Sequence, residues 1–246
     1  MLRRLALLAL TPLLMVPTGC GGDDPPPSGP PRERFGPEAV EGVFAVETIR
    51  ARLVPVSDLV GLGRHEEAAV HLRHARRLWS EVSAMIRRGD PVLEREVSAA
   101  FARVESAIAR EGTFDAVRDV VSPLGAQLLG GVREELVEKE ARLDPGVNAA
   151  VLIGLLDRME DAYATGDRPA LQHAFGIIDR SQSVARDIAG DLGPQRDAVI
   201  EGLKALRKEA FPEGIVLPDE QAPLAEIERR AEDIRAALRE RFDLAG

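Results

Sequence analysis

Between the turn signals Gly89-Asp-Pro91 and Glu111-Gly-Thr113, residues 91–110 read PVLEREVSAAFARVESAIAR. Its apolar side chains recur every three or four residues, at Leu93, Val97, Ala100, Phe101, Val104 and Ile108. This spacing is typical of an α-helix that buries one face against its neighbours. Asp-Pro precedes the stripe and Glu111-Gly-Thr113 follows it, and these are start and stop signals of a helix. A similar stripe runs from Leu224 to Phe242. Both segments are therefore predicted to be core-facing helices.

The same helical pattern extends over nearly all of the chain from about residue 37. Aromatic residues are only 4% of the 246 residues, and no run of alternating β-branched residues bounded by turns occurs. Pairs of Gly with Asp or Pro divide this region into about eight segments, with breaks near residues 61–63, 89–91, 111–113, 143–145, 165–167, 190–194 and 212–218. The fourth segment contains Pro123 and Gly130-Gly131 and is expected to kink. We predict an all-α fold of about eight helices.

An internal repeat of roughly 100 residues suggests how these helices are grouped. Leu53–Ile108 aligns with Leu156–Ala210 almost without gaps, and Gly63 then meets Gly166. The matches fall on apolar positions and turns, so either duplication or shared helical geometry explains them. We expect two tandem up-and-down four-helix bundles, residues 37–143 and 144–246, with one elongated eight-helix array as the alternative.

The first nineteen residues have the parts of an export signal. A basic start containing Arg3 and Arg4 is followed by an apolar run, Leu5–Val16, which is too short to span a bilayer as a helix. The next residues, Pro17-Thr-Gly-Cys20, resemble the lipobox of bacterial lipoproteins, whose cysteine is lipidated and becomes the mature N-terminus. Pro17 departs from that motif, which usually has Leu there. The alternative is ordinary secretion with a free Cys20.

Cys20 is the only cysteine, so it can form no intramolecular disulfide. Lipidation would remove a lone thiol and anchor the chain stably if two or more acyl chains were attached. Residues 20–36 are rich in Pro and Gly and are predicted to be a semi-rigid tether or simply a disordered tail. The predicted location is therefore extracytoplasmic, with the chain held to the bacterial cell membrane by its lipid.

The formal net charge is −9, and removal of residues 1–19 with their two arginines leaves about −11. An acidic chain without a clustered Lys/Arg stripe argues against binding to nucleic acid. Solubility is a sufficient explanation of this charge.

Three of the four histidines, together with Glu67, lie in one predicted helix. At about 100° per residue, Glu67, His71 and His74 fall within roughly 60° of one another, and Glu81 lies about 20° beyond His74. Imidazole and carboxylate groups are ligands for iron and other transition metals, so these four residues are the candidate metal site. Exposed or capping histidines are the alternative. The fourth histidine, His173, is expected to point away from the apolar stripe of its helix.

The first unit also resembles a known region. The residues that carry the resemblance are Ala68-Ala-Val-His-Leu-Arg-His-Ala75, Leu78-Trp79, Arg88-Gly-Asp-Pro91, Ala99-Ala-Phe101 and Ile108. This pattern is similar to the extracytoplasmic helical region associated with high-affinity iron permeases, over about residues 64–129. Leu72 and Trp79 stand where that family would have tyrosines. The resemblance implies an accessory role in iron uptake, with a permease as partner.

No motif of a common enzyme class is present: the chain has no Gly-rich phosphate loop, no Gly-x-Ser-x-Gly, no CxxC and no His-Glu-x-x-His. We therefore expect a protein that is not an enzyme. The preferred function is an accessory binding protein in metal (iron) uptake. The alternative is a non-catalytic scaffold that docks a membrane or envelope protein.

Overall fold

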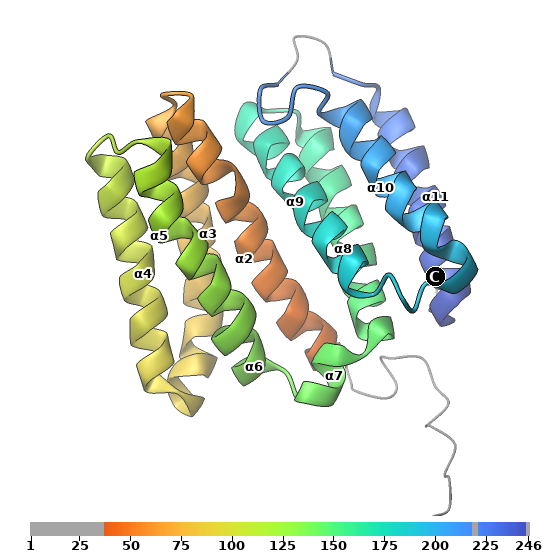
Figure 1. Cartoon of the computed structure of the whole chain (residues 1–246), viewed down its shortest axis with the longest axis horizontal. Coiled ribbons are helices and arrows are strands. Elements are labelled where there is room, and N and C mark those ends of the chain that lie inside the picture. Colours follow the sequence, from red (N-terminus) through yellow and green to blue (C-terminus); the bar gives the residue numbers. More distant parts are fainter. Residues whose placement is uncertain (1–36, 218–220, 245–246) are drawn as a thin grey trace, which may run out of the picture.

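The computed structural model describes residues 37–217 and 221–244, and all regular secondary structure in these ranges is helical (Figure 1). The first unit consists of four long helices joined by short turns: α2 (Pro37–Gly61), α3 (His65–Gly89), α4 (Pro91–Ala109) and α5 (Phe114–Gln127). The all-α fold predicted from the sequence is confirmed.

The second unit has the same plan. Its four long helices are α8 (Pro145–Thr165), α9 (Arg168–Asp187), α10 (Arg196–Ala210) and α11 (Leu224–Phe242), and a 3-10 turn, η2 (Gly193–Gln195), leads into α10. The link between the units is made of three short elements: the π-helix η1 (Leu128–Val132), α6 (Arg133–Leu136) and α7 (Lys139–Leu143).

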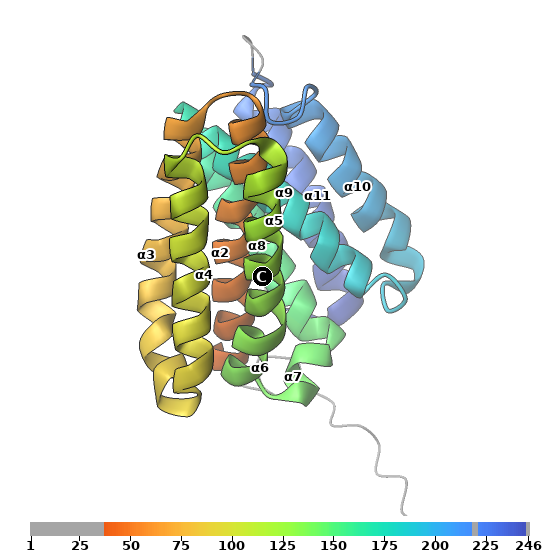
Figure 2. The ribbon, with the colours of Figure 1, turned by 60° about the vertical axis from the view of Figure 1, so that its left-hand side comes forward.

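Each unit closes on itself as an up-and-down four-helix bundle. In the first, consecutive helices pack on one another and α5 returns to α2; in the second, α11 returns to α8 in the same way. The units are joined because α2 also packs against α8 and α9, as the two views show (Figures 1 and 2). The buried apolar side chains of both units consequently form one continuous cluster.

Helix starts follow the Asp-Pro signals of the sequence. The Asp90 carboxylate accepts hydrogen bonds from the backbone N–H groups of Val92 and Leu93, both at 2.9 Å. Asp144 caps α8 in the same manner, and Asp167 caps α9 by accepting from Ala170 N at 2.8 Å. These carboxylates satisfy N–H groups that have no partner within the helix.

The turns before α3 and α9 share a backbone conformation. Gly63 has φ 73° and Gly166 has φ 72°, a left-handed conformation that glycine adopts without the steric cost of a Cβ. The two glycines are the pair aligned by the sequence repeat. Duplication and the boundary at residues 143–144 remain predictions.

The predicted kink in the fourth segment takes the form of a π-helical turn. Pro123 lies within α5 without ending it, and the chain widens at Leu128–Val132, which includes Gly130 and Gly131. π-helical turns insert an extra residue into a helix and change its direction.

Most of the predicted apolar stripe residues are buried, and Leu93, Leu224 and Phe242 are half-buried against the core. On α4, Val97, Ala100, Phe101, Val104 and Ile108 are all at most 4% exposed. The central position of α2 was not predicted from the sequence. This helix is apolar on several faces and contacts helices of both units. An amphipathic stripe is absent from such a helix because it has no single solvent face.

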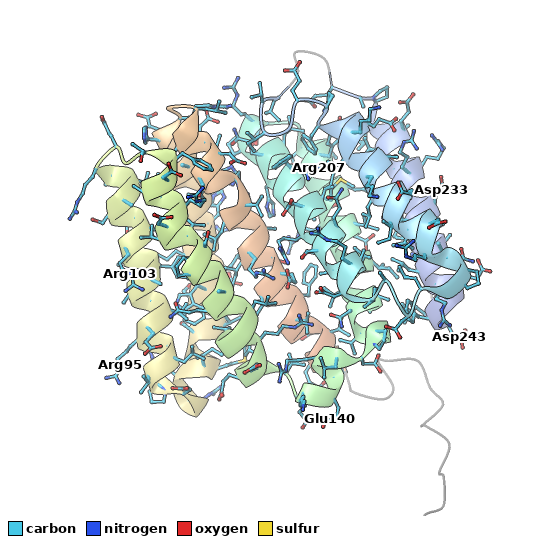
Figure 3. All side chains as sticks on the ribbon, in the orientation of Figure 1. Arg95, Arg103, Glu140, Arg207, Asp233 and Asp243 are labelled. Carbon is cyan, nitrogen blue, oxygen red and sulfur yellow. The ribbon has the colours of Figure 1, made fainter. Side chains whose placement is uncertain are left out.

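Charged side chains project outward from the outer helices, for example Arg95 and Arg103 on α4 and Asp233 on α11 (Figure 3). None of the helices that the structure describes combines the length and the apolar character needed to cross a membrane. The predicted signal peptide, Cys20 and the tether lie outside the described residues.

Candidate functional site

Glu67, the first predicted metal ligand, is held by nitrogen donors. Its carboxylate accepts from Arg64 Nε at 2.8 Å and from Gln172 Nε2 at 2.6 Å, and Arg168 lies 3.6 Å away. Burial acts to raise the pKa of Glu67, but the hydrogen bonds from Arg64 and Gln172 outweigh it and leave this pKa below its usual range. These donors occupy the carboxylate that a metal would need.

His71 is fully buried between α3 and α9. Its Nε2 lies 3.0 Å from Oε1 of Gln172, whose amide nitrogen in turn donates to Glu67. Burial lowers the pKa of His71 to about 4, so the ring is neutral near pH 7. A neutral ring whose Nε2–H donates to Gln172 has Nδ1 as an acceptor, and this atom is buried without a partner.

The four predicted ligands are not brought together at one point. Glu67 and Glu81 are fourteen residues apart on α3, which corresponds to about 21 Å along the helix axis. A transition metal needs its ligand atoms about 2 Å away, so angular proximity on one helix face is insufficient. Glu81 is exposed. Among the described residues, no group of three or more His, Cys, Asp or Glu side chains is arranged to hold a metal ion.

A cavity of about 310 Å³ lies beside the predicted set, where α2, α3, α8 and α9 meet. Figures 1 and 2 show these helices grouped around α2 in the middle of the molecule. The cavity is lined by basic, acidic and small residues: Arg52, His74, Arg158, Asp161, Ala162, Thr165, Asp167, Pro169, Ala170 and His173. His74 is thus the one predicted ligand that faces it.

Two arginines line the cavity together with two carboxylates, Asp161 and Asp167. Arg52, on α2, is half-buried, and its Nε is buried without a hydrogen-bond partner. Burial, with repulsion from Arg158 and Arg77, lowers the pKa of Arg52 to about 10, which leaves the guanidinium group charged at neutral pH. Arg158, on α8, is exposed at the edge. Within the described part of the chain, neither arginine forms an ion pair.

Two histidines add unpartnered nitrogens. His173 is 3% exposed, and its Nδ1 has no hydrogen-bond partner; the same is true of Nδ1 of His74. Burial, followed by the charge of Arg52, lowers the pKa of His173 to about 2, and the same causes lower the pKa of His74. Both rings are therefore neutral near pH 7, and each offers one N–H donor.

His173 was expected to point away from the apolar stripe of its helix, and the structure nevertheless buries it. Residues 171–178 of α9 are all buried, because α9 packs against α2 and α3 as well as against α8 and α10. Gly176 allows a close approach of α9 to α2, because a Cβ there would lie 2.1 Å from the carbonyl oxygen of Ala51. A histidine outside the apolar stripe is thereby enclosed.

Carboxylates lie on the same side as the α8–α9 turn. Asp161 and Asp167 are both exposed, and the Asp167 carboxylate already caps α9. The Thr165 hydroxyl donates to the backbone oxygen of Asp161 at 2.9 Å. The lining residues include no cysteine or serine, and the cavity offers cations and N–H donors from the arginines and histidines beside carboxylates and one hydroxyl at its α8–α9 end.

Buried and half-buried arginines elsewhere have partners. Arg180 donates to Glu47 Oε2 at 2.9 Å, and Arg50 donates to the same carboxylate, which is 1% exposed. Arg235 donates to Asp157, Glu160 and Glu232 at 2.8–3.0 Å.

Arg52 therefore differs from the other buried and half-buried arginines of the described residues, and the sequence analysis did not single it out. The available signal was the pair Arg50 and Arg52 inside the otherwise mostly apolar stretch of residues 49–60.

Comparison of the chain with protein-family models, with curated proteins and with solved structures gave no match in any of the three. The similarity to the helical region of iron permeases rests on the residues that carry it and stays a prediction.

Proposed function

We propose that the chain is a non-catalytic, lipid-anchored binding protein of the cell envelope and that the cavity between α2, α3, α8 and α9 is its ligand site. The observation that carries this proposal is the half-buried, unpaired guanidinium group of Arg52 beside the unpartnered Nδ1 of buried His173. Such groups cost stability unless something satisfies them, and binding sites are where proteins retain them.

The size of the cavity agrees with a small ligand. Pockets for small molecules start at about 300 Å³ and combine a few polar groups with an otherwise apolar wall. Here the wall is more polar than that: seven of the ten lining residues are polar or charged, and the apolar ones are Ala162, Pro169 and Ala170, so the site suits a small polar ligand. The export signal and Cys20 would place this site outside the cytoplasm.

A screen against the full chain, purified in detergent, tests the proposal. Organic acids, amino acids, sugars, phosphate, Fe(II), Fe(III) and Zn(II) would be compared by their effect on the thermal midpoint. A ligand of the cavity should stabilise the native chain and lose this effect in Ala170→Leu, which fills the cavity without changing its charge. Ala164→Leu is the matched control, since Ala164 is exposed on α8 and does not line the cavity.

The outcomes separate the functions. Stabilisation by iron that is lost in Ala170→Leu would support a role in metal uptake. A scaffold would use an outer surface, so no compound would stabilise it through the cavity. No stabilisation by any compound, or equal stabilisation of Ala170→Leu, would contradict the proposal.

A further inference from the structure

The side chains around the cavity indicate what it binds. Four nitrogen-bearing side chains line it, two of them permanent cations, and none forms an ion pair within the described ranges. This occurs in a chain of net charge −9, where carboxylates are more abundant than cations. Asp161 and Asp167 line the same space, so the formal charges of the lining balance, and the case for an anionic ligand rests on the buried, unsatisfied N–H donor of Arg52.

Of the three unsatisfied nitrogens in the lining, Nε of Arg52 is a donor, and Nδ1 of His74 and of His173 is a donor in the Nδ1–H tautomer. Arg52 Nε–H has no acceptor, and a guanidinium group presents a planar fork that suits the oxygens of a carboxylate or phosphate. His74 and His173 each contribute an imidazole with a free Nδ1. Oxygen atoms of a single small ligand could accept from these donors together.

The cavity volume limits the ligand. A water molecule takes about 30 Å³ of liquid volume, so about 310 Å³ holds a compound of roughly ten heavy atoms or fewer. Asp161 and Asp167 disfavour a ligand of high negative charge at the α8–α9 turn.

We propose that this cavity binds a small oxyanion, a short-chain carboxylate or phosphate, with Arg52 as the inner cation and Arg158 as the outer one. His74 and His173 act as neutral hydrogen-bond donors to the same ligand. This inference rests on the proposed function, since it assigns a ligand class to the site proposed above.

Isothermal titration of the full chain in detergent provides the test, with inorganic phosphate, succinate and acetate as probes. Sodium chloride of equal ionic strength controls for screening, and ethylammonium chloride controls for charge sign. At least one oxyanion should bind at one saturable site, and the comparison of phosphate with the carboxylates identifies the preferred group.

Variants locate the binding. Arg158→Gln removes a charge from an exposed position, so we expect the variant to fold. Its affinity for the oxyanion should be at least about tenfold lower than that of the native chain. Arg52→Gln should remove measurable binding. Arg103→Gln is the matched control, because Arg103 is also exposed and unpaired within the described chain but lies on α4 at the far edge of the molecule (Figure 3).

Each outcome decides between the two proposals. Oxyanion binding that survives both Arg52→Gln and Arg158→Gln would overturn the inference. A metal or neutral compound that binds in place of an oxyanion, and is lost in Ala170→Leu, would also overturn it while leaving the proposed function intact. Absence of any binding at the cavity would overturn both.

Discussion

Arg52 and Arg180 are both half-buried, but their guanidinium groups are in opposite electrostatic situations. Arg180 meets the buried carboxylate of Glu47 at 2.9 Å, whereas Arg52 forms no ion pair among the described residues. Removing one partner of a buried pair leaves an uncompensated charge, but removing an unpaired charge relieves a cost. The two residues therefore allow a direct comparison.

We expect Arg52→Met to raise the free energy of unfolding by about 1 kcal/mol in Tris chloride buffer, because a desolvated cation is replaced by an apolar side chain of similar length. Arg180→Met should lower it by about 2 kcal/mol, since Glu47 keeps only Arg50. Urea denaturation measures both values. Equal destabilisation by the two substitutions would show that Arg52 has a partner that stabilises the fold.

The buried histidines predict loss of stability in acid. The unfolded chain protonates histidine near pH 6.5, whereas His71 in the folded chain has its pKa lowered to about 4. Between these values the unfolded state binds a proton that the folded state excludes, so the free energy of unfolding falls as pH falls. The slope is about 1.4 kcal/mol per pH unit for each such histidine.

Urea titrations at pH 6.5, 5.5 and 4.5 measure this slope. His71→Gln should reduce the slope of the unfolding free energy against pH by the contribution of one proton, about 1.4 kcal/mol per pH unit. This change in slope is expected whatever the substitution does to the absolute stability. Ser80→Ala, at an exposed position of the same helix, removes no titratable group and is the control for the slope. An identical slope in native chain and His71→Gln would refute the assignment.

At the scale of elements, the boundaries could be predicted because their signals are local. Asp90, Asp144 and Asp167 cap the helices that follow them, and each needs only its own neighbours to do so. The apolar stripes of α3 and α4 could also be predicted from the sequence, since each of these helices has one solvent-facing side. The central position of α2 could not be predicted from the sequence, because its contacts with α8 and α9 depend on how the two units pack together.

The candidate site was predicted only in part for the same reason. His71 and His74 were singled out from one helix, but His173 and Arg52 reach the cavity from α9 and α2. Helix periodicity gives the angle between residues of one helix and says nothing of a second helix. Glu67 and Glu81 lie at similar angles around α3, and this similarity placed them in one predicted site. They are nevertheless far apart along the axis of that helix.

The contact between α2 and α9 can be tested at Gly176. A Cβ at this position would meet the Ala51 carbonyl oxygen at 2.1 Å, so Gly176→Ala should push the helices apart and lower the free energy of unfolding by about 2 kcal/mol. Gly125→Ala, within α5, has nothing within 4 Å of its Cβ and should raise it by about 0.5–1 kcal/mol. Thermal or urea unfolding distinguishes the two, and a neutral Gly176→Ala would contradict the close packing.

At the scale of the whole molecule, two four-helix bundles share a continuous apolar core through α2, and the cavity lies at their junction. A ligand there would contact helices of both units. The predicted lipid at Cys20 would hold this assembly at the membrane surface by a tether of residues 20–36.

Membrane attachment is predicted to depend on Cys20 alone. Cells expressing the native chain should incorporate labelled palmitate into it and retain it in the membrane fraction, because acyl chains supply the binding energy. Cys20→Ser should abolish labelling and move the chain to the soluble fraction. Secretion of an unlabelled native chain with a free thiol would favour the alternative that Pro17 raises.

The most direct test of the central claim is the imidazole ¹⁵N resonance of His173 in the full chain, followed while phosphate, succinate or acetate is added. Its Nδ1 is buried and unpartnered beside Arg52, so it can report a ligand only if that ligand enters the cavity. The account predicts a saturable shift with at least one of these oxyanions, absent with sodium chloride and absent in Arg52→Gln. A His173 resonance that stays fixed throughout all three titrations would contradict it.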